Sequence, residues 1–168
     1  MPFTPFHFGP GAFVHSAAPR HISFLAFCGA NVLVDVEPLY YMVTGQFPIH
    51  RFLHAYVGAT VAGLIFVLLF ALVRRFGMPL LKLLRLENLS VRAVALGAFA
   101  GTYSHVLLDS LMHADMRPFA PFSDANPLLS AVSLRALHGF CLLAGLAGLG
   151  IIFARRSRPG RPSRARVP

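Results

Sequence analysis

The chain has 168 residues, of which 56% are hydrophobic and only 12% are charged, with a mean hydropathy of +0.65. Soluble domains carry about a quarter charged residues, so this composition argues against a soluble domain and predicts one membrane-embedded domain. The net charge of +9 does not indicate nucleic-acid binding. Eleven of the fifteen Lys and Arg residues fall in two blocks, at 74–92 and 155–166, and each block directly follows an apolar stretch.

The first apolar segment, residues 6–18, is only about four helical turns long and has Pro10 near its start. Such a segment either lies flat at the membrane interface or enters the bilayer part-way. If it is a half-span that reverses at Pro19 and Arg20, His7 reaches the same face of the membrane as Asp35. If it lies flat on the cytoplasmic side, His7 is far from Asp35.

Four longer segments predict transmembrane helices. Residues 55–73 and 136–154 are uncharged runs of 19 residues that each end at an Arg pair. At 1.5 Å per residue, a run of that length crosses a hydrocarbon layer of about 30 Å. Residues 93–108 are apolar apart from His105, and this span is expected to continue to about residue 113. Residues 22–43 are apolar as far as Val34, and Pro38 is expected to break or kink that helix.

The expected fold is therefore all-α, a polytopic helical membrane protein with about four transmembrane helices plus a short N-terminal apolar helix. One helical membrane domain is expected over residues 1–154. Residues 77–87 predict a short amphipathic helix at the interface, and residues 155–168 a basic, disordered cytoplasmic tail.

The two basic blocks predict the topology. With both on the cytoplasmic side of a plasma (inner) membrane, their partners are anionic headgroups, and the connections at 44–54 and 113–135 lie outside. Three segments then bring polar side chains to the outer face. These side chains are Asp35 and Glu37, His50 and His54, and His105, Asp109 and His113.

Four-residue spacing makes this set a candidate metal site. His105, Asp109 and His113 follow one another at four-residue steps, which would place them on one face of a helix, and His50 and His54 repeat the step. Asp35 and Asp109 lie within apolar segments, where a carboxylate without a partner is costly. The partner is a metal, an imidazolium or Arg51. A divalent ion such as zinc is favoured, because imidazoles and carboxylates are its usual ligands.

The remaining polar groups have simpler interpretations. His15, His21 and His138 are expected at headgroup level, without a role in the site. Asp115 and Asp124 lie in a Pro-containing loop, where solvated carboxylates are the expectation.

The order of these motifs resembles the predicted membrane-bound metal-dependent hydrolases of bacteria. Members of that family share an early Thr-His, a Pro-Asp-x-Asp motif that ends a helix, a His-Arg-Gly-x-Thr-His motif, and Ser-His-x-x-x-Asp followed by Trp-Pro-x-Ser. The corresponding segments here are Phe6-His7, Val34-Asp35-Val36-Glu37, His50-Arg51-Phe52-Leu53-His54, Ser104-His105 with Asp109, and Ala120-Pro121-Phe122-Ser123-Asp124. The two histidines of the third segment are four residues apart here rather than five, and Glu37 replaces the second Asp.

The resemblance implies a helical membrane hydrolase, related in logic to zinc-dependent phospholipase C, with a divalent ion held by some of five residues. These residues are His7, Asp35, His54, His105 and Asp109. Glu37 or His50 would accept a proton from water, and Arg51 or Arg117 would stabilise negative charge on a lipid-borne ester or phosphoester. The alternative is a non-enzymatic membrane protein with a structural metal site or an ion-handling role. A scaffold in which the histidines pair directly with the acids is a third possibility.

Overall fold

The computed structural model describes residues 5–157, and within that range the secondary structure is entirely helical. A 3-10 helix, η1 (Pro5–His7), leads into the ten-residue helix α1 (Phe8–Ala17). Five further α-helices follow: α2 (Phe24–Val43), α3 (Tyr56–Phe76), α4 (Met78–Leu83), α5 (Val91–Ser110) and α6 (Leu134–Arg156). The all-α expectation is confirmed.

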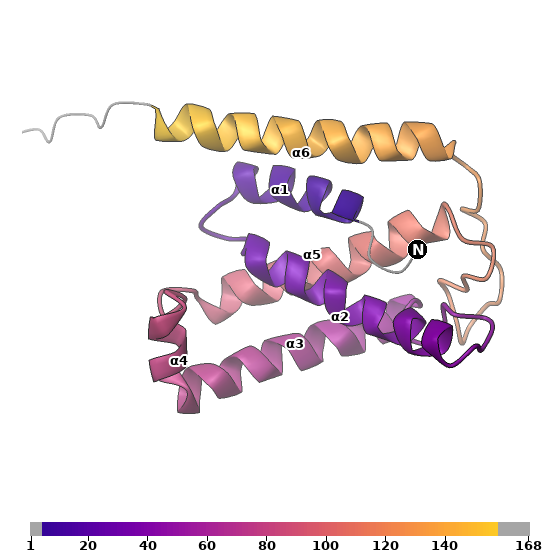
Figure 1. Ribbon diagram of the computed structural model, residues 1–168, viewed down its shortest axis with the longest axis horizontal. Helices are drawn as coiled ribbons and strands as arrows, with labels where there is room; N and C mark the ends of the chain where they lie inside the picture. Colours follow the sequence, from indigo (N-terminus) through magenta and orange to yellow (C-terminus); the bar gives the residue numbers. More distant parts are fainter. Residues whose placement is uncertain (1–4, 158–168) are drawn as a thin grey trace, which may run out of the picture.

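Helices α2 and α5 run in the same direction and pack side by side (Figure 1). Each begins at a serine whose side chain accepts a hydrogen bond from a backbone N–H in the first turn, Ser23 in α2 and Ser90 in α5. At this shared starting end, the backbone N–H of Ser23 donates to the carbonyl of Ala93 at 2.9 Å. Helix α3 packs against α5 and α2 from the other side and runs in the opposite direction.

Helix α1 lies between α6 and α2 and is about 15 Å long, half the thickness of a bilayer core (Figure 1). Helix α1 packs closely against α6, because glycines occupy the positions where the two backbones contact each other. A methyl group on Gly9 would overlap the carbonyl of Cys141, and one on Gly148 would lie 2.6 Å from the carbonyl carbon of Ala12. At the far end of α1, Arg155 donates a hydrogen bond to the carbonyl of Ser16. These contacts match the half-span alternative for residues 6–18.

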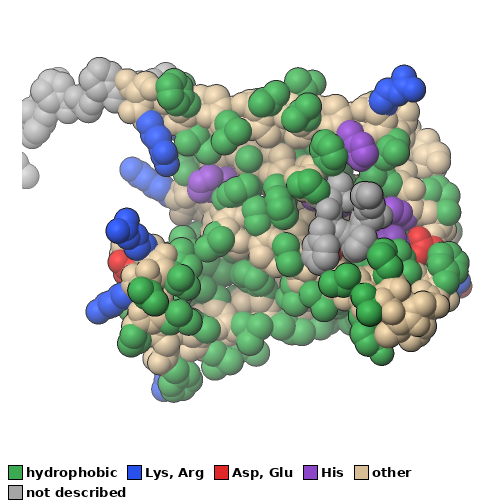
Figure 2. Space-filling view, viewed as in Figure 1, with side chains coloured by type: hydrophobic (Ala, Val, Ile, Leu, Met, Phe, Trp, Pro, Cys, Tyr) green, Lys and Arg blue, Asp and Glu red, His purple; other side chains and the backbone are tan. Residues whose placement is uncertain are grey.

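Within residues 5–157, three helices, α3, α5 and α6, are long and apolar enough to cross a membrane. Their outer faces carry exposed leucines and phenylalanines, such as Leu68 on α3 and Leu143 and Phe153 on α6, and apolar side chains are spread over the face shown in Figure 2. The fourth expected span forms the 20-residue helix α2 but is not among these three. Its polar residues, which include Asp35 and Glu37, lower the mean hydropathy of α2.

Several expected helix limits need correction. Helix α5 ends at Ser110, so His113 lies in the following turn and not on the same helical face as His105 and Asp109. Helix α2 continues through Pro38 to Val43, so the proline does not break it. Of the segment 77–87, for which an interfacial helix was expected, only Met78–Leu83 forms a helix, α4. Helix α6 extends to Arg156, and the rest of the expected tail, 158–168, lies outside the described residues.

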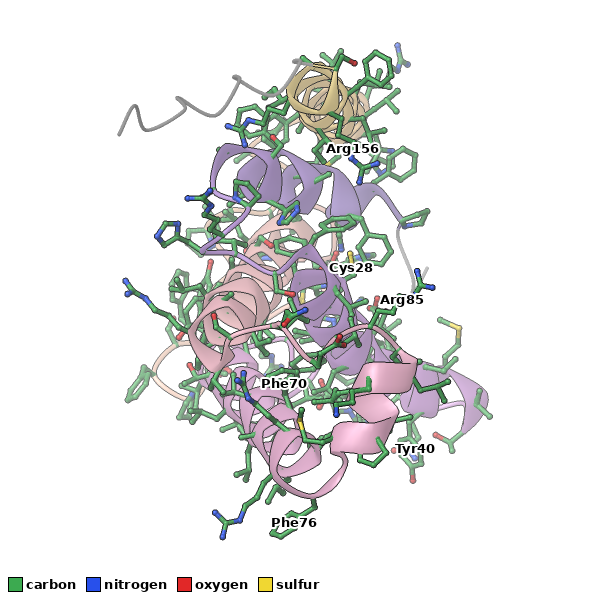
Figure 3. The ribbon with its side chains drawn as sticks, turned by 90° about the vertical axis from the view of Figure 1, so that its left-hand side faces the viewer. Cys28, Tyr40, Phe70, Phe76, Arg85 and Arg156 are labelled. Atoms are coloured by element: carbon green, nitrogen blue, oxygen red, sulfur yellow. The ribbon has the colours of Figure 1, made fainter. Side chains whose placement is uncertain are left out.

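The described parts of the two basic blocks, residues 74–92 and Arg155 and Arg156, lie at the same end of the molecule, because α3 and α6 both run toward it. Blue side chains gather at the left-hand end in Figure 2, over α4 and the ends of α3 and α6. Viewed from that end, Figure 3 shows α6 above α1, then the pair α2 and α5, with α3 and α4 below. The connections 44–55 and 111–133 lie at the opposite end. His54 and His113 belong to these connections, and His105 and Asp109 to the last two turns of α5.

Candidate metal centre

One face of α5 carries two glycines and then two ionisable residues, at four-residue steps. The glycines allow α2 to pack closely against this face. A methyl group on Gly97 would overlap the carbonyl of Ser23, and one on Gly101 would lie 2.5 Å from the carbonyl of Phe27. Because both positions lack a side chain, the two helix backbones approach closely here. The next two positions of the same face are His105 and Asp109, which therefore meet α2 without intervening side chains.

Four buried side chains from three segments converge at this contact. Asp35 comes from α2, His54 from the loop before α3, and His105 and Asp109 from α5; one ligand atom of each lies within 4.8 Å of the other three. His105 Nε2 is 3.3 Å from Asp35 Oδ1 and 3.2 Å from Asp109 Oδ2. His54 Nε2 is 3.6 Å from the same Asp109 Oδ2. The residues predicted as one cluster are thus brought together.

The hydrogen bonds around His105 determine which of its two ring nitrogens carries the hydrogen and which has the lone pair. Asn31 Nδ2 donates to the carbonyl of Phe27 at 2.9 Å, which turns its amide oxygen toward His105 Nδ1, 3.0 Å away. His105 Nδ1 therefore carries the hydrogen and donates it to Asn31. In the neutral ring, Nε2 then presents a lone pair to the oxygens of Asp35 and Asp109.

His54 is arranged in the same way by Glu37. Glu37 Oε2 accepts hydrogen bonds from the backbone N–H groups of Leu53 (2.9 Å) and Arg51 (3.2 Å), which ties the loop before α3 to α2. The same oxygen lies 3.4 Å from His54 Nδ1. With its Nδ1 hydrogen directed at Glu37, neutral His54 presents the Nε2 lone pair to Asp109.

In the neutral tautomers of His54 and His105, these nitrogens and the carboxylate oxygens face one another with lone pairs on both sides. Nε2 of His7, His54 and His105 and Oδ1 of Asp109 are buried and have no hydrogen-bond partner among residues 5–157. Buried polar atoms are nearly always paired, and lone pairs at this separation repel unless a proton or a metal cation lies between them. Imidazole nitrogens held by an acceptor on the other ring nitrogen, together with carboxylates, are a common donor set for divalent ions. The cluster could therefore bind a metal ion.

His7 reaches the cluster from the beginning of α1. Its Nε2 is 3.2 Å from Asp109 Oδ1, and its Nδ1 is 3.3 Å from His105 Nδ1. It is buried but does not belong to the group of four whose ligand atoms are mutually close. The close packing of α1 on α6 places it there, which the sequence alone left open.

A second group lies beside the first and shares Asp109. His50, Asp109 and His113 also bring one ligand atom each within 4.8 Å of one another. The rings of His50 and His113 have centroids 4.3 Å apart, and the centroid of His50 lies 4.8 Å from that of His54. His113 is therefore part of the cluster although α5 ends before it, because the turn after Ser110 carries it back toward His50.

Asp115 contacts His50. The expectation that Asp115 would be a solvated loop carboxylate was therefore wrong. Its Oδ1 is 2.8 Å from His50 Nδ1, and its Oδ2 accepts from the backbone N–H groups of Ile49 (3.1 Å) and His50 (3.2 Å). Burial would raise the pKa of Asp115, but these hydrogen bonds outweigh it and leave the pKa below its ordinary value. Burial and the neighbouring His54 lower the pKa of His50, and the opposing effect of Asp115 is smaller. The lowered pKa favours the neutral ring of His50.

Arg51 and Arg117, the expected cations, are engaged near the cluster rather than in it. The guanidinium of Arg51 lies 3.6 Å from the ring centroid of Tyr41 and donates to the carbonyl of Pro48 at 2.8 Å. Arg117 forms an exposed ion pair with Asp124 at 3.0 Å, and Asp124 is a solvated loop carboxylate as expected. Within the described residues, neither arginine pairs with Asp35 or Asp109.

Two cavities approach the cluster from different sides. An open groove of about 640 Å³ runs beside His50, with Arg51 and Arg117 at its polar positions and Phe52, Ala55 and Pro121 among its apolar walls. A smaller cavity of about 190 Å³ touches His7, Asp35 and His105, together with Asn31, Pro5, Phe8 and Val32. The first has room for a lipid headgroup and part of a chain, and the second for several waters.

Some polar residues play no part in the centre, and one contributor was missed. His15 contacts the carbonyl of Ile22, His138 stacks on Phe6, and His21 is exposed, in keeping with the simple interpretation of these histidines. Asn31 was missed, although it lies four residues before Asp35, the spacing that was noted for the histidines. An amide in the middle of an apolar helix was the available signal.

Comparisons with known proteins add no assignment: no family model, no curated protein and no solved structure matches the chain. The fold and the cluster together define an all-helical protein with apolar helices long enough to span a membrane and a buried His and Asp group that could hold a metal ion.

Proposed function

We propose that this protein is a membrane-embedded, metal-dependent hydrolase that acts on a lipid-borne ester or phosphoester. The observation that carries the proposal is the convergence of ligand atoms of His54, His105, Asp35 and Asp109 in a buried space, with Nδ1 of each of the two rings facing another acceptor. The cation is a divalent ion, with zinc the first candidate. The similarity of motif order to the bacterial membrane-bound metal-dependent hydrolases supports the same assignment.

The residues of the chain supply the parts that hydrolysis requires. Asp35, His54, His105 and Asp109 would hold the ion, and His7 would support it through Asp109. When bound, a divalent ion lowers the pKa of water toward about 7 and polarises a carbonyl or phosphoryl oxygen. His50 lies on the groove and, when neutral, accepts a proton at Nε2 while Asp115 holds its Nδ1.

Glu37 has a positioning role in this scheme. Its Oε2 already accepts two backbone hydrogen bonds and faces His54, so it orients His54 and the loop before α3. Arg51 is held by Tyr41 and Pro48 at the wall of the groove, and a substrate anion in the groove would meet this guanidinium and that of Arg117.

The position of the centre supports a lipid-borne substrate. The ligands lie toward the loop ends of α2 and α5, and His105 is about 7.5 Å of helix rise from the end of α5. That depth corresponds to the boundary between acyl chains and headgroups, where the scissile bond of a lipid ester lies. We place this end on the outer face of a bacterial plasma membrane, with the basic end and anionic headgroups on the cytoplasmic side.

A structural metal is the second candidate, and one observation favours it. Asp35, His54, His105 and Asp109 are four buried donors, and a structural zinc is closed by four protein ligands. The cavity of about 190 Å³ that touches Asp35 and His105 favours hydrolysis instead, because it gives water a place beside two of the donors. An ion path is not supported, because the α2–α5 contact beyond the cluster is filled by apolar side chains such as Phe27, Val94 and Ala98.

The test is hydrolysis by the full chain purified in detergent. The probes are p-nitrophenyl phosphate, bis-p-nitrophenyl phosphate and p-nitrophenyl butyrate, followed by vesicles of phosphatidylglycerol and phosphatidylethanolamine with analysis of released products. We expect turnover that a chelator removes and zinc or manganese restores, and that His105→Ala abolishes. Bound metal without turnover of any probe would assign the ion a structural role.

A further inference from the structure

The group His50, Asp109 and His113 is arranged as a second metal site. We infer that the centre is dinuclear, with a second divalent ion held by His50 and His113 and with Asp109 shared between the two ions. This inference deepens the proposed function and rests on it, because the shared ligand Asp109 belongs to the first site.

His50 is held as a ligand by a partner of its own. Asp115 Oδ1 lies 2.8 Å from His50 Nδ1, and Asp115 also accepts from the backbone N–H of Ile49 and of His50. With Nδ1–H donated to Asp115, the lone pair of the neutral ring is on Nε2. In the dinuclear centre this lone pair binds the second ion, in place of the proton-accepting role proposed above for a single-ion site. The same arrangement is present at His54 with Glu37 and at His105 with Asn31, so each of the three rings has an acceptor on Nδ1.

His113 is brought beside His50 by the turn that follows α5. Its backbone N–H donates to the carbonyl of Asp109 at 2.9 Å, and Asn126 Nδ2 donates to the carbonyls of Ser110 (2.9 Å) and His113 (3.4 Å). The long loop 111–133 thus fixes the turn on the end of the helix. The ring centroids of His50 and His113 are 4.3 Å apart, at an interplanar angle of 31°.

Asp109 has the oxygens that a shared ligand needs. Its Oδ2 faces His54 and His105, at 3.6 Å and 3.2 Å from their Nε2 atoms. Its Oδ1 is buried, lies 3.2 Å from His7 Nε2 and makes no hydrogen bond among the described residues. A carboxylate can bind one ion through each oxygen, and many hydrolytic centres hold two ions about 3.5–4 Å apart.

The two sites differ in their number of protein ligands and in their access to the groove. The first has four protein donors, all of them buried, and is reached by the smaller cavity of about 190 Å³. The second has three, one of them only half-buried, and His50 also lines the open groove of about 640 Å³. Three protein ligands leave a position free, so the second ion would be the one that meets water and substrate from the groove.

The experiment counts ions and tests whether they are adjacent. The full chain is purified in detergent, stripped with a chelator and loaded separately with zinc and with manganese. Elemental analysis should find about two ions per chain, and electron paramagnetic resonance of the manganese form should show an exchange-coupled pair instead of the six-line spectrum of an isolated ion.

His113→Ala should retain about one ion and give the six-line manganese spectrum, and His50→Ala should do the same. His21→Ala, at an exposed histidine of the opposite end, should leave both ions in place. A wild-type chain with one ion, unaffected by His113→Ala, would overturn the second site and leave the first site intact. Loss of both ions in both variants would also overturn it, and a wild-type chain without any ion would refute both sites.

Discussion

His105 presents Nε2 to the carboxylate of Asp109, four residues further along α5, at 3.2 Å, with both side chains buried. In an isolated helix this pair would be a weak surface interaction. Here it lies against α2, where Asp35 adds a second carboxylate 3.3 Å from the same nitrogen. Two carboxylates on one imidazole nitrogen require more positive charge than a single neutral ring provides, and this requirement is the physical basis of the metal hypothesis.

Removal of this pair should empty the centre. We expect His105→Ala combined with Asp109→Ala to reduce bound zinc or manganese to background in elemental analysis of detergent-purified protein, because Asp109 contacts ligands of both groups. His138→Ala, which affects only a ring stacked on Phe6, serves as the control and should keep the metal. Metal that stays in the double variant would locate the binding site elsewhere in the chain.

Asn31 should influence affinity without touching the ion. Asn31→Ala removes the acceptor that holds His105 Nδ1–H, so the ring loses its fixed orientation, and we expect metal affinity to fall roughly tenfold to a hundredfold. Competition with a fluorescent chelator measures the change. Thr102→Val, a buried polar-to-apolar change one turn away on α5, is the matched control and should leave affinity unchanged.

Asp115 should act on the second ion alone. Asp115→Asn weakens the acceptor for His50 Nδ1 and for two backbone N–H groups, so the affinity of the second ion should fall roughly tenfold while the first stays bound. Metal titration followed by elemental analysis separates the two. Asp124→Asn, which changes only an exposed carboxylate paired with Arg117, should bind both ions like the wild type. Equal effects of the two variants would contradict the assigned role of Asp115.

The half-span α1 should depend on the glycines of α6. Gly148→Ala places a methyl group 2.6 Å from the carbonyl carbon of Ala12, which must push α1 away, whereas a methyl group on Gly150 meets nothing within 4 Å. Overpacking of this kind costs about 1–3 kcal/mol, so the thermal midpoint in detergent should fall by several degrees for Gly148→Ala only. Similar midpoints for the two variants would show that α1 does not pack on α6 as described.

Labelling of single cysteines tests the proposed topology. In a background with Cys28→Ala and Cys141→Ala, Gln46→Cys should react with a membrane-impermeant maleimide in intact cells, and Ser157→Cys should react only after lysis. The expectation follows from the basic residues at the ends of α3 and α6, which favour the cytoplasmic side. The reverse labelling pattern would invert the proposed orientation and with it the face that carries the centre.

Much of the helical layout was predictable because it depends on local composition. An uncharged run of 19 residues that ends at two arginines predicts a spanning helix whatever its neighbours are, and α3 and α6 were found within a few residues of the predicted limits. The helix ends were less certain. The His105, Asp109 and His113 spacing suggested one continuous face, but α5 stops at Ser110, and His113 reaches the cluster through a turn that the loop 111–133 stabilises.

The chain by itself determined which residue types were available: four histidines and three carboxylates near the same ends of apolar segments, since hydrophobicity and charge act along the sequence. Tertiary structure decided which atoms face one another. Only the close approach of α2 to α5 across Gly97 and Gly101 brings Asn31 and Asp35 to His105, and only the packing of α1 on α6 brings in His7. Tautomers and shared ligands follow from distances of about 3 Å between residues far apart in sequence, and no pattern of spacing along one chain contains those distances.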